Sequence, residues 1–174
     1  GGLVATNNLL LYRKLFALRN LGATKKNKHF YLGINSRLDT VQAAVLKNKL
    51  KSIMKINDTR RKLANFYDKN LKIIKKITIT KTNPGSSRHL YVIRTKSRNK
   101  LIKYLSKKKI NCQIHYPYSL NKISFIKKRI KTKVSLRNSE YWSDYCLSLP
   151  LHPKLKIFQI KKVVREIKNF FQNK

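Results

Sequence analysis

Residues 32–46 read Leu32-Gly33-Ile34-Asn35-Ser36-Arg37-Leu38-Asp39-Thr40-Val41-Gln42-Ala43-Ala44-Val45-Leu46. Residues 23–36, which include the first part of this stretch, are predicted to form a basic loop. From Asp39 onward the apolar residues recur at steps of three and four, which predicts one long helix to about Tyr67. Asp39 lies near the expected start of that helix, where a carboxylate interacts favourably with the helix dipole.

Shorter helices and strands are predicted on both sides of this helix. The predicted strands are 1–6, 77–80, 89–94 and 111–115, and the predicted helices are 9–19, 97–107, 138–147 and 155–171. Asn7 and Asn8 can cap the helix at 9–19, and Gly22 suits a left-handed conformation after its end. Residues 149–153 are expected to form a rigid connector because they contain two prolines.

The bulk composition is that of a globular chain without a membrane span. The 174 residues are 41% hydrophobic, and no apolar run is long enough to cross a bilayer. No signal-peptide pattern is present, so we expect a cytoplasmic protein with no membrane partner. The two cysteines, Cys112 and Cys146, have no Cys-x-x-Cys spacing, which favours buried reduced thiols over a disulfide.

The charge of the chain is extreme: 42 Lys and Arg stand against 6 Asp and Glu, a formal net charge of +36. One interpretation is a basic nucleic-acid-binding module, since lysine and arginine release counterions from phosphates. The other is compositional drift toward residues with A/T-rich codons, because Lys, Asn and Ile are abundant together and the lysines are scattered. Drift is favoured, and salt-sensitive nucleic-acid binding would then be incidental.

The stretch at 32–46 resembles the Gly-x-Asn-x-Arg-x-Asp/Glu-x-x-Gln-Ala-Ala signature of the DegT/DnrJ/EryC1/StrS family. Members of that family use pyridoxal 5'-phosphate to place an amino group on a nucleotide-linked keto sugar. Other blocks resemble the family in the same order along the chain. They are Gly1–Asn7, Leu18–Gly22, Asn57–Tyr67, His89–Arg94, His115–Pro117 and Leu147–Pro153.

This resemblance implies an α/β protein of the aspartate-aminotransferase-like fold (fold type I). Residues 1–52 would be the C-terminal remnant of the large cofactor-binding domain, and residues 53–174 the small C-terminal α+β domain. In the family, the Schiff-base lysine precedes the Gly-Gly that matches Gly1 and Gly2, so no catalytic residue is assigned here. Because the chain opens on glycine and its only methionine is Met54, we expect a partial sequence.

The resemblance also implies an activity for the intact enzyme. It would move an amino group from an amino acid, with glutamate the expected donor, to a nucleotide-linked keto sugar for polysaccharide biosynthesis. It would act as a homodimer with shared active sites, and the present chain alone would be inactive. The alternatives are the nucleic-acid-binding module and a non-functional gene remnant.

Two residues of the signature are candidate cofactor ligands by this resemblance. Asn35 matches the asparagine that reaches the phosphate of the partner subunit's cofactor; the alternative is a loop asparagine that caps its own turn. Arg37 either supports the same phosphate or pairs with Asp39.

Four further residues are candidate substrate ligands by the same resemblance. Lys26 and His29 match a lysine and a histidine that face the sugar nucleotide, with a solvated loop as the alternative. His115 and Tyr116 match a His-Tyr-Pro block on the substrate side of the pocket, and the alternative is a pair that packs on Pro117. The histidines show no metal-ligand spacing.

Overall fold

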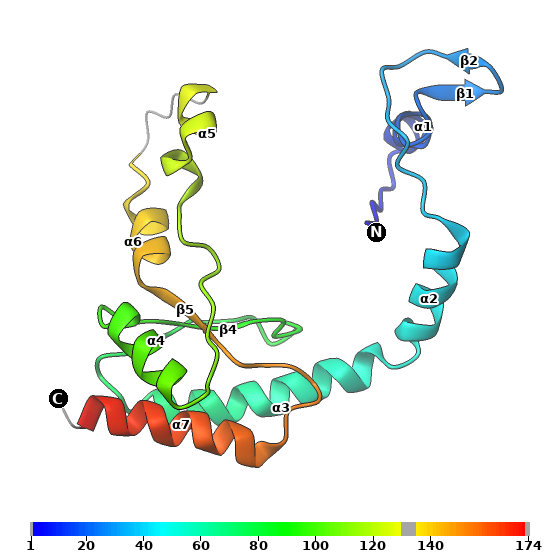
Figure 1. Ribbon diagram of the computed structural model, residues 1–174. Helices are drawn as coiled ribbons and strands as arrows, with labels where there is room; N and C mark the ends of the chain where they lie inside the picture. Colours follow the sequence, from blue (N-terminus) through cyan, green and yellow to red (C-terminus); the bar gives the residue numbers. More distant parts are fainter. Residues whose placement is uncertain (1, 130–134, 173–174) are drawn as a thin grey trace. The chain divides into compact units, whose positions relative to one another are not determined.

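The computed structural model describes residues 2–129 and 135–172. The chain divides into two compact units, Gly1–Ile53 and Met54–Lys174 (Figure 1). Each unit holds its own set of candidate site residues.

The first unit is built from two helices and a small hairpin. Helix α1 spans Leu9–Leu18, and the side chain of Asn8 caps it by accepting a hydrogen bond from the backbone N–H of Leu11 at 3.0 Å, as predicted. Residues 2–6 are not a strand, because no neighbouring strand among the described residues supplies their ladder hydrogen bonds.

The segment predicted as a basic loop contains a β-hairpin. Strand β1 (Ala23–Lys25) pairs with β2 (Lys28–His29) in antiparallel fashion, and Asn27 adopts a φ of 58° at the turn. Asparagine tolerates this left-handed conformation better than most residues, which allows so short a connection.

The predicted long helix is interrupted. Helix α2 spans Thr40–Leu50 and α3 spans Ile53–Leu71, with a turn at Lys51 and Ser52. At the turn, the Ser52 hydroxyl donates to the backbone carbonyl of Lys49 at 3.1 Å, a local bond that competes with helical hydrogen bonding. The side chain of Asp39 caps α2 by accepting from the Val41 N–H at 2.8 Å.

The second unit contains a three-stranded antiparallel sheet in the order β3-β4-β5. Strand β3 is Thr78–Ile79, β4 is Tyr91–Arg94 and β5 is Cys146–Leu149. Tyr91 lies opposite Leu149 and Ile93 opposite Leu147, so these four side chains share one face of the sheet.

Three helices cover that face and form the hydrophobic core. They are α3, α4 (Arg98–Lys107) and α7 (Ile157–Gln172), shown in Figure 1. The predicted apolar stripe of the last helix is confirmed, since Ile160, Val163, Val164 and Ile167 are all buried. Phe171, predicted on the same stripe, is only partly buried, and Phe170 is buried in its place.

Two predictions in this unit are wrong. Residues 111–115 form no strand and contribute only one isolated bridge, between Gln113 and Ser148. The helix predicted at 138–147 is α6, Arg137–Tyr145, and its expected last residues belong to β5. A short 3-10 helix (Leu120–Lys122) and α5 (Ser124–Arg129) precede α6.

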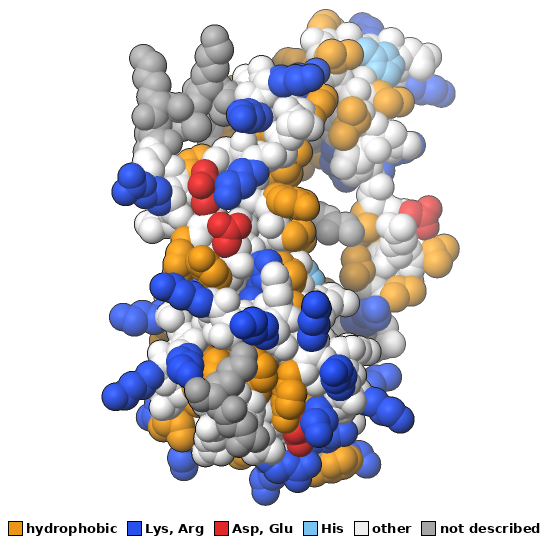
Figure 2. Space-filling model, turned by 60° about the vertical axis from the view of Figure 1, so that its left-hand side comes forward, with side chains coloured by type: hydrophobic (Ala, Val, Ile, Leu, Met, Phe, Trp, Pro, Cys, Tyr) orange, Lys and Arg blue, Asp and Glu red, His pale blue; other side chains and the backbone are white. Residues whose placement is uncertain are grey.

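The surface carries basic side chains over both units, as the face in Figure 2 shows. All six acidic residues of the chain are engaged: Asp39 caps α2, and the others pair with lysine or arginine. Both cysteines are free, and burial raises the pKa of the Cys112 thiol to about 11. Among the described residues, no helix is long and apolar enough to cross a membrane.

Candidate functional site

The signature segment 33–36 is fixed by hydrogen bonds to the end of α1. The Ile34 N–H donates to Leu18 O at 2.9 Å, Leu21 N–H to Ile34 O at 3.1 Å, and Ser36 N–H to Arg19 O at 2.8 Å. The first and third of these bonds satisfy the carbonyls of Leu18 and Arg19, which the end of α1 leaves free. The segment that carries the candidate cofactor ligands therefore has an ordered backbone. We call α1 together with residues 33–36 the frame.

Two glycines permit this close approach of the two backbone segments. A Cβ atom on Gly33 would lie 2.3 Å from the Gly22 nitrogen, and Gly22 itself has a φ of 77°. Gly22 thus has the left-handed conformation predicted for it, and a Cβ there would lie 1.7 Å from the Tyr31 carbonyl oxygen. Only glycine fits at either position.

Asn35 and Arg37 contact each other on this frame. The Arg37 Nε–H donates to Asn35 Oδ1 at 3.3 Å, and both side chains are exposed. Asn35 therefore does not cap its own turn, and the carboxylate of Asp39 is engaged with α2 rather than with Arg37. The Asn35 amide N–H groups and the outer guanidinium nitrogens of Arg37 have no hydrogen-bond partner among the described residues, so these donors are available to a ligand. A cluster of donors with one positive charge suits a phosphate.

Lys26 and His29 lie on the β1–β2 hairpin. They share the lining of a hollow of about 310 Å³ with Lys25, whereas Lys28 is not part of that lining. The His29 Nδ1 lies 2.9 Å from the backbone oxygen of Leu21. Since a carbonyl only accepts, Nδ1 carries the proton, and Nε2 of the neutral ring is an acceptor.

His115 and Tyr116 belong to the second unit. The His115 Nδ1 lies 2.8 Å from Ser148 Oγ on β5, and its ring meets the Tyr116 ring edge-on at 5.6 Å between centroids. Tyr116 is 72% exposed and its carbonyl accepts a weak bond from the Cys146 thiol at 3.9 Å. The six predicted residues thus form three pairs: Asn35 and Arg37 are in contact, Lys26 and His29 line one hollow beside the hairpin, and the rings of His115 and Tyr116 meet in the second unit.

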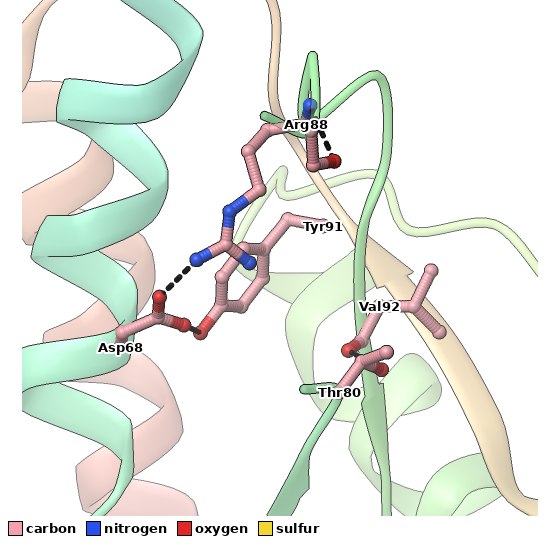
Figure 3. Close-up of polar contacts among 6 residues, drawn as sticks. Asp68, Thr80, Arg88, Tyr91 and Val92 are labelled. Carbon is pink, nitrogen blue, oxygen red and sulfur yellow. Dashed lines mark hydrogen bonds and ion pairs between the residues drawn. The ribbon is translucent and has the colours of Figure 1, made fainter. Parts of the chain in front are cut away.

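A polar cluster beside the core was missed by sequence reasoning. The Asp68 carboxylate on α3 accepts from the Arg88 guanidinium and, at 2.8 Å, from the Tyr91 hydroxyl (Figure 3). Burial and the hydrogen bond to Asp68 both raise the pKa of Tyr91. This cluster joins the loop before β4 to α3, and its role is structural. Its partners are 20 and 23 residues apart in sequence, so no local pattern signals it.

The structure shows no candidate metal site among the residues that it describes. Nowhere in them do three His, Cys, Asp or Glu side chains lie close enough together to hold an ion. The groups suited to a cofactor are instead the phosphate-type donors of Asn35 and Arg37. Their chemistry fits the phosphate end of pyridoxal 5'-phosphate.

Comparisons with known proteins identify the family of the chain. The model of the DegT/DnrJ/EryC1/StrS aminotransferase family matches residues 1–168. The chain is 32% identical over 172 residues to dTDP-3-amino-3,6-dideoxy-alpha-D-galactopyranose transaminase from Aneurinibacillus thermoaerophilus, covering 98% of this chain and 47% of that protein. It is also 32% identical to dTDP-3-amino-3,4,6-trideoxy-alpha-D-glucose transaminase from Streptomyces venezuelae, with coverage of 98% and 45%.

Solved structures show the same similarity. The crystal structure of S. venezuelae DesV in complex with a ketimine intermediate has a TM-score of 0.87 and 31% identity, covering 95% of this chain and 45% of that one. A family member from Brucella abortus gives a TM-score of 0.87 at 30% identity, with the same two coverages. The chain therefore spans about half the length of the proteins it resembles.

Proposed function

The chain belongs to the DegT/DnrJ/EryC1/StrS aminotransferase family, a family of sugar aminotransferases, and from that membership we propose a specific role for it. It forms the C-terminal part of an enzyme that moves an amino group from an amino acid, glutamate in our proposal, to a nucleotide-linked keto sugar. The first unit belongs to the cofactor-binding domain, and the second is the small domain.

The observation that carries this proposal is the Arg37–Asn35 contact on the frame built by α1 and residues 33–36. The Arg37 Nε–H donates to the Asn35 oxygen and orients the amide, whose N–H groups have no partner among the described residues. Donors held in place lose little entropy on binding an anion. Asn35 and Arg37 are thus suited to hold the phosphate of pyridoxal 5'-phosphate.

The cofactor, when bound, supplies an electron sink that allows an amino group to be exchanged between donor and acceptor. The residues of this chain bind and orient the reactants around it. Lys26 supplies a positive charge for a diphosphate, and His29 Nε2 accepts from a sugar hydroxyl. His115 and Tyr116 bind the substrate from the second unit, where Tyr116 exposes most of its surface.

The surface of the first unit supports a further part of the proposal. Of residues 2–53, only Ala17, Gly22 and Ala23 are buried, whereas Leu32 is 102% and Leu3 94% exposed. Apolar and aromatic side chains also line a hollow of about 940 Å³ that includes Tyr12, Phe16 and Leu38. Exposed apolar area of this extent marks an interaction surface. We assign it to the remaining half of the family fold and to the partner subunit of a homodimer.

The test is a chimera in which the N-terminal half of the A. thermoaerophilus relative precedes residue 1 of this chain. We expect the chimera to bind pyridoxal 5'-phosphate and to transfer the amino group of glutamate to a dTDP-linked keto sugar, and the 174-residue chain alone to show no turnover. In the chimera, Asn35→Ala should weaken cofactor binding about 10- to 100-fold, as for loss of a charge-assisted hydrogen bond. The exposed Asn48 on α2 provides the matched control, Asn48→Ala.

Three results would count against the proposal. Turnover by the isolated chain would contradict its inactivity. A folded chimera that binds no cofactor would indicate a non-functional remnant. Equal cofactor affinities of the Asn35→Ala and Asn48→Ala chimeras would remove Asn35 from the site.

A further inference from the structure

Ser148 is a buried polar residue that the proposed function does not use. It lies at the centre of β5, where it is 5% exposed between the core residues Leu147 and Leu149. Its backbone exchanges two hydrogen bonds with Gln113, at 2.7 and 3.1 Å, and it lies opposite Val92 of β4. The position of its hydroxyl is therefore fixed by the sheet.

The only hydrogen-bond partner of the Ser148 hydroxyl among the described residues is His115 Nδ1, at 2.8 Å. A hydroxyl has one hydrogen, and a buried hydroxyl that donates to nothing is destabilising. Since Nδ1 is the only acceptor in reach, the Ser148 hydroxyl donates and Nδ1 is unprotonated. The proton of the neutral imidazole then lies on Nε2.

The Nε2 atom faces away from this bond and is available to a ligand. It has no hydrogen-bond partner among the described residues, and it is not one of the buried unsatisfied atoms. The ring itself is half-buried against Tyr116, which limits its rotation. His115 therefore presents one N–H donor in one direction.

From these contacts we infer that Ser148 is a positioning residue, which holds His115 as the Nε2–H tautomer so that this N–H donates to an oxygen of the nucleotide-linked sugar. The inference rests on the proposed function for the identity of the ligand. His29 in the first unit has the opposite tautomer, since its Nδ1–H donates to a carbonyl and its Nε2 accepts.

The experiment is nitrogen NMR of the histidine side chains in the full chain labelled at histidine, above the pH at which the rings are neutral. His115→Gln identifies the His115 signals among the four histidines. We expect the wild-type ring to carry its proton mainly on Nε2, with a small Nδ1-protonated fraction. Ser148→Ala should raise the Nδ1-protonated fraction about fivefold, the effect of one ordinary hydrogen bond, and Ser148→Thr should restore the wild-type spectrum.

Ser143 supplies the matched control. It is also buried, at 3% exposure, but its hydroxyl donates to the Glu140 carbonyl at 2.9 Å. Ser143→Ala removes a buried hydroxyl of equal size and should leave the His115 nitrogens unchanged. If Ser148→Ala does not fold, the wild-type and Ser148→Thr spectra decide.

Wild-type protonation on Nδ1 would overturn the inference, because Ser148 would then be the acceptor. A folded Ser148→Ala variant with the wild-type tautomer would overturn it as well. Neither result depends on turnover. A confirmed tautomer with an inactive chimera would refute only the proposed function, and an active chimera with the wrong tautomer would refute only the role of Ser148.

Discussion

Removing the Asp68 carboxylate should destabilise the second unit by about 2–3 kcal/mol, below the 3–5 kcal/mol typical of a fully buried pair. Asp68 accepts from Arg88 and from the Tyr91 hydroxyl, and the Arg88 side chain is only 12% exposed. In Asp68→Ala both donors lose their acceptor, and a mostly buried guanidinium is left without its counter-charge. We expect a smaller loss of stability than for a fully buried pair because the Asp68 side chain is 31% exposed. In the variant, water can therefore partly replace the carboxylate as the partner of Arg88 and Tyr91.

Asp58→Ala is the control, since Asp58 lies on the same helix and pairs with Arg61. There the two side chains are 56% and 30% exposed, and a surface pair contributes about 0.2–1 kcal/mol. Urea unfolding can be followed by the fluorescence of the single tryptophan, Trp142, which lies on α6 of the second unit. With a slope of about 1.5 kcal/mol per molar urea, Asp68→Ala should lower the midpoint by about 1.3–2 M. A midpoint lowered no more than in Asp58→Ala would refute the reasoning.

Three other measurements test the structure. Burial raises the pKa of Tyr91 above its ordinary 10.0, so the folded state holds this proton more tightly; the resulting stability is intact below pH 10 and is lost as pH rises through the folded pKa. When urea midpoints are measured at increasing pH, the Tyr91→Phe variant should therefore lose less stability above pH 10 than the wild type. The control Tyr118→Phe, at an exposed position, should behave like the wild type. Gly22→Ala should abolish the hydrogen-exchange protection of the amides at 21, 34 and 36, whereas Gly2→Ala, with nothing within 4 Å, should not. Binding to nucleic acid should fall with salt equally for all sequences, and replacing the lysines at 161–162 by Gln should lower the salt slope by at most about 2; a sequence preference that persists at moderate salt would instead support a dedicated module.

The helices were predictable where apolar residues recur with a period of 3.6. Helices α1, α4 and α7 lie within about two residues of their predicted bounds, because apolar residues at this spacing mark them and Asn8 caps the start of α1. Strand β5 was not predictable in this way. All four of its residues are buried, so alternation is absent, and the apolar run appeared to continue α6.

The candidate site was also predictable only in part. The resemblance predicts Asn35 and Arg37 as cofactor ligands, but the contact between them depends on side-chain conformations that no residue pattern encodes. Ser148 lies 33 residues from His115 and is brought to it only by the sheet and the bridge at Gln113. Contacts between residues far apart in the chain follow from tertiary packing, which single-sequence patterns do not contain.

The two units also differ in what their apolar residues stabilise. In the second unit the apolar pattern predicts a core that the unit itself buries. In the first unit the same kind of pattern on α1 leaves Leu10 at 76% and Tyr12 at 54% exposure. Covering such a side chain contributes about 1.5–3 kcal/mol, so most of the stabilisation available to this unit must come from a surface outside it. The frame around Asn35 depends instead on backbone hydrogen bonds and on two glycines that lie within the unit. The donors that we propose for the phosphate are therefore positioned by contacts within the first unit, and the exposed apolar surface is not needed to position them.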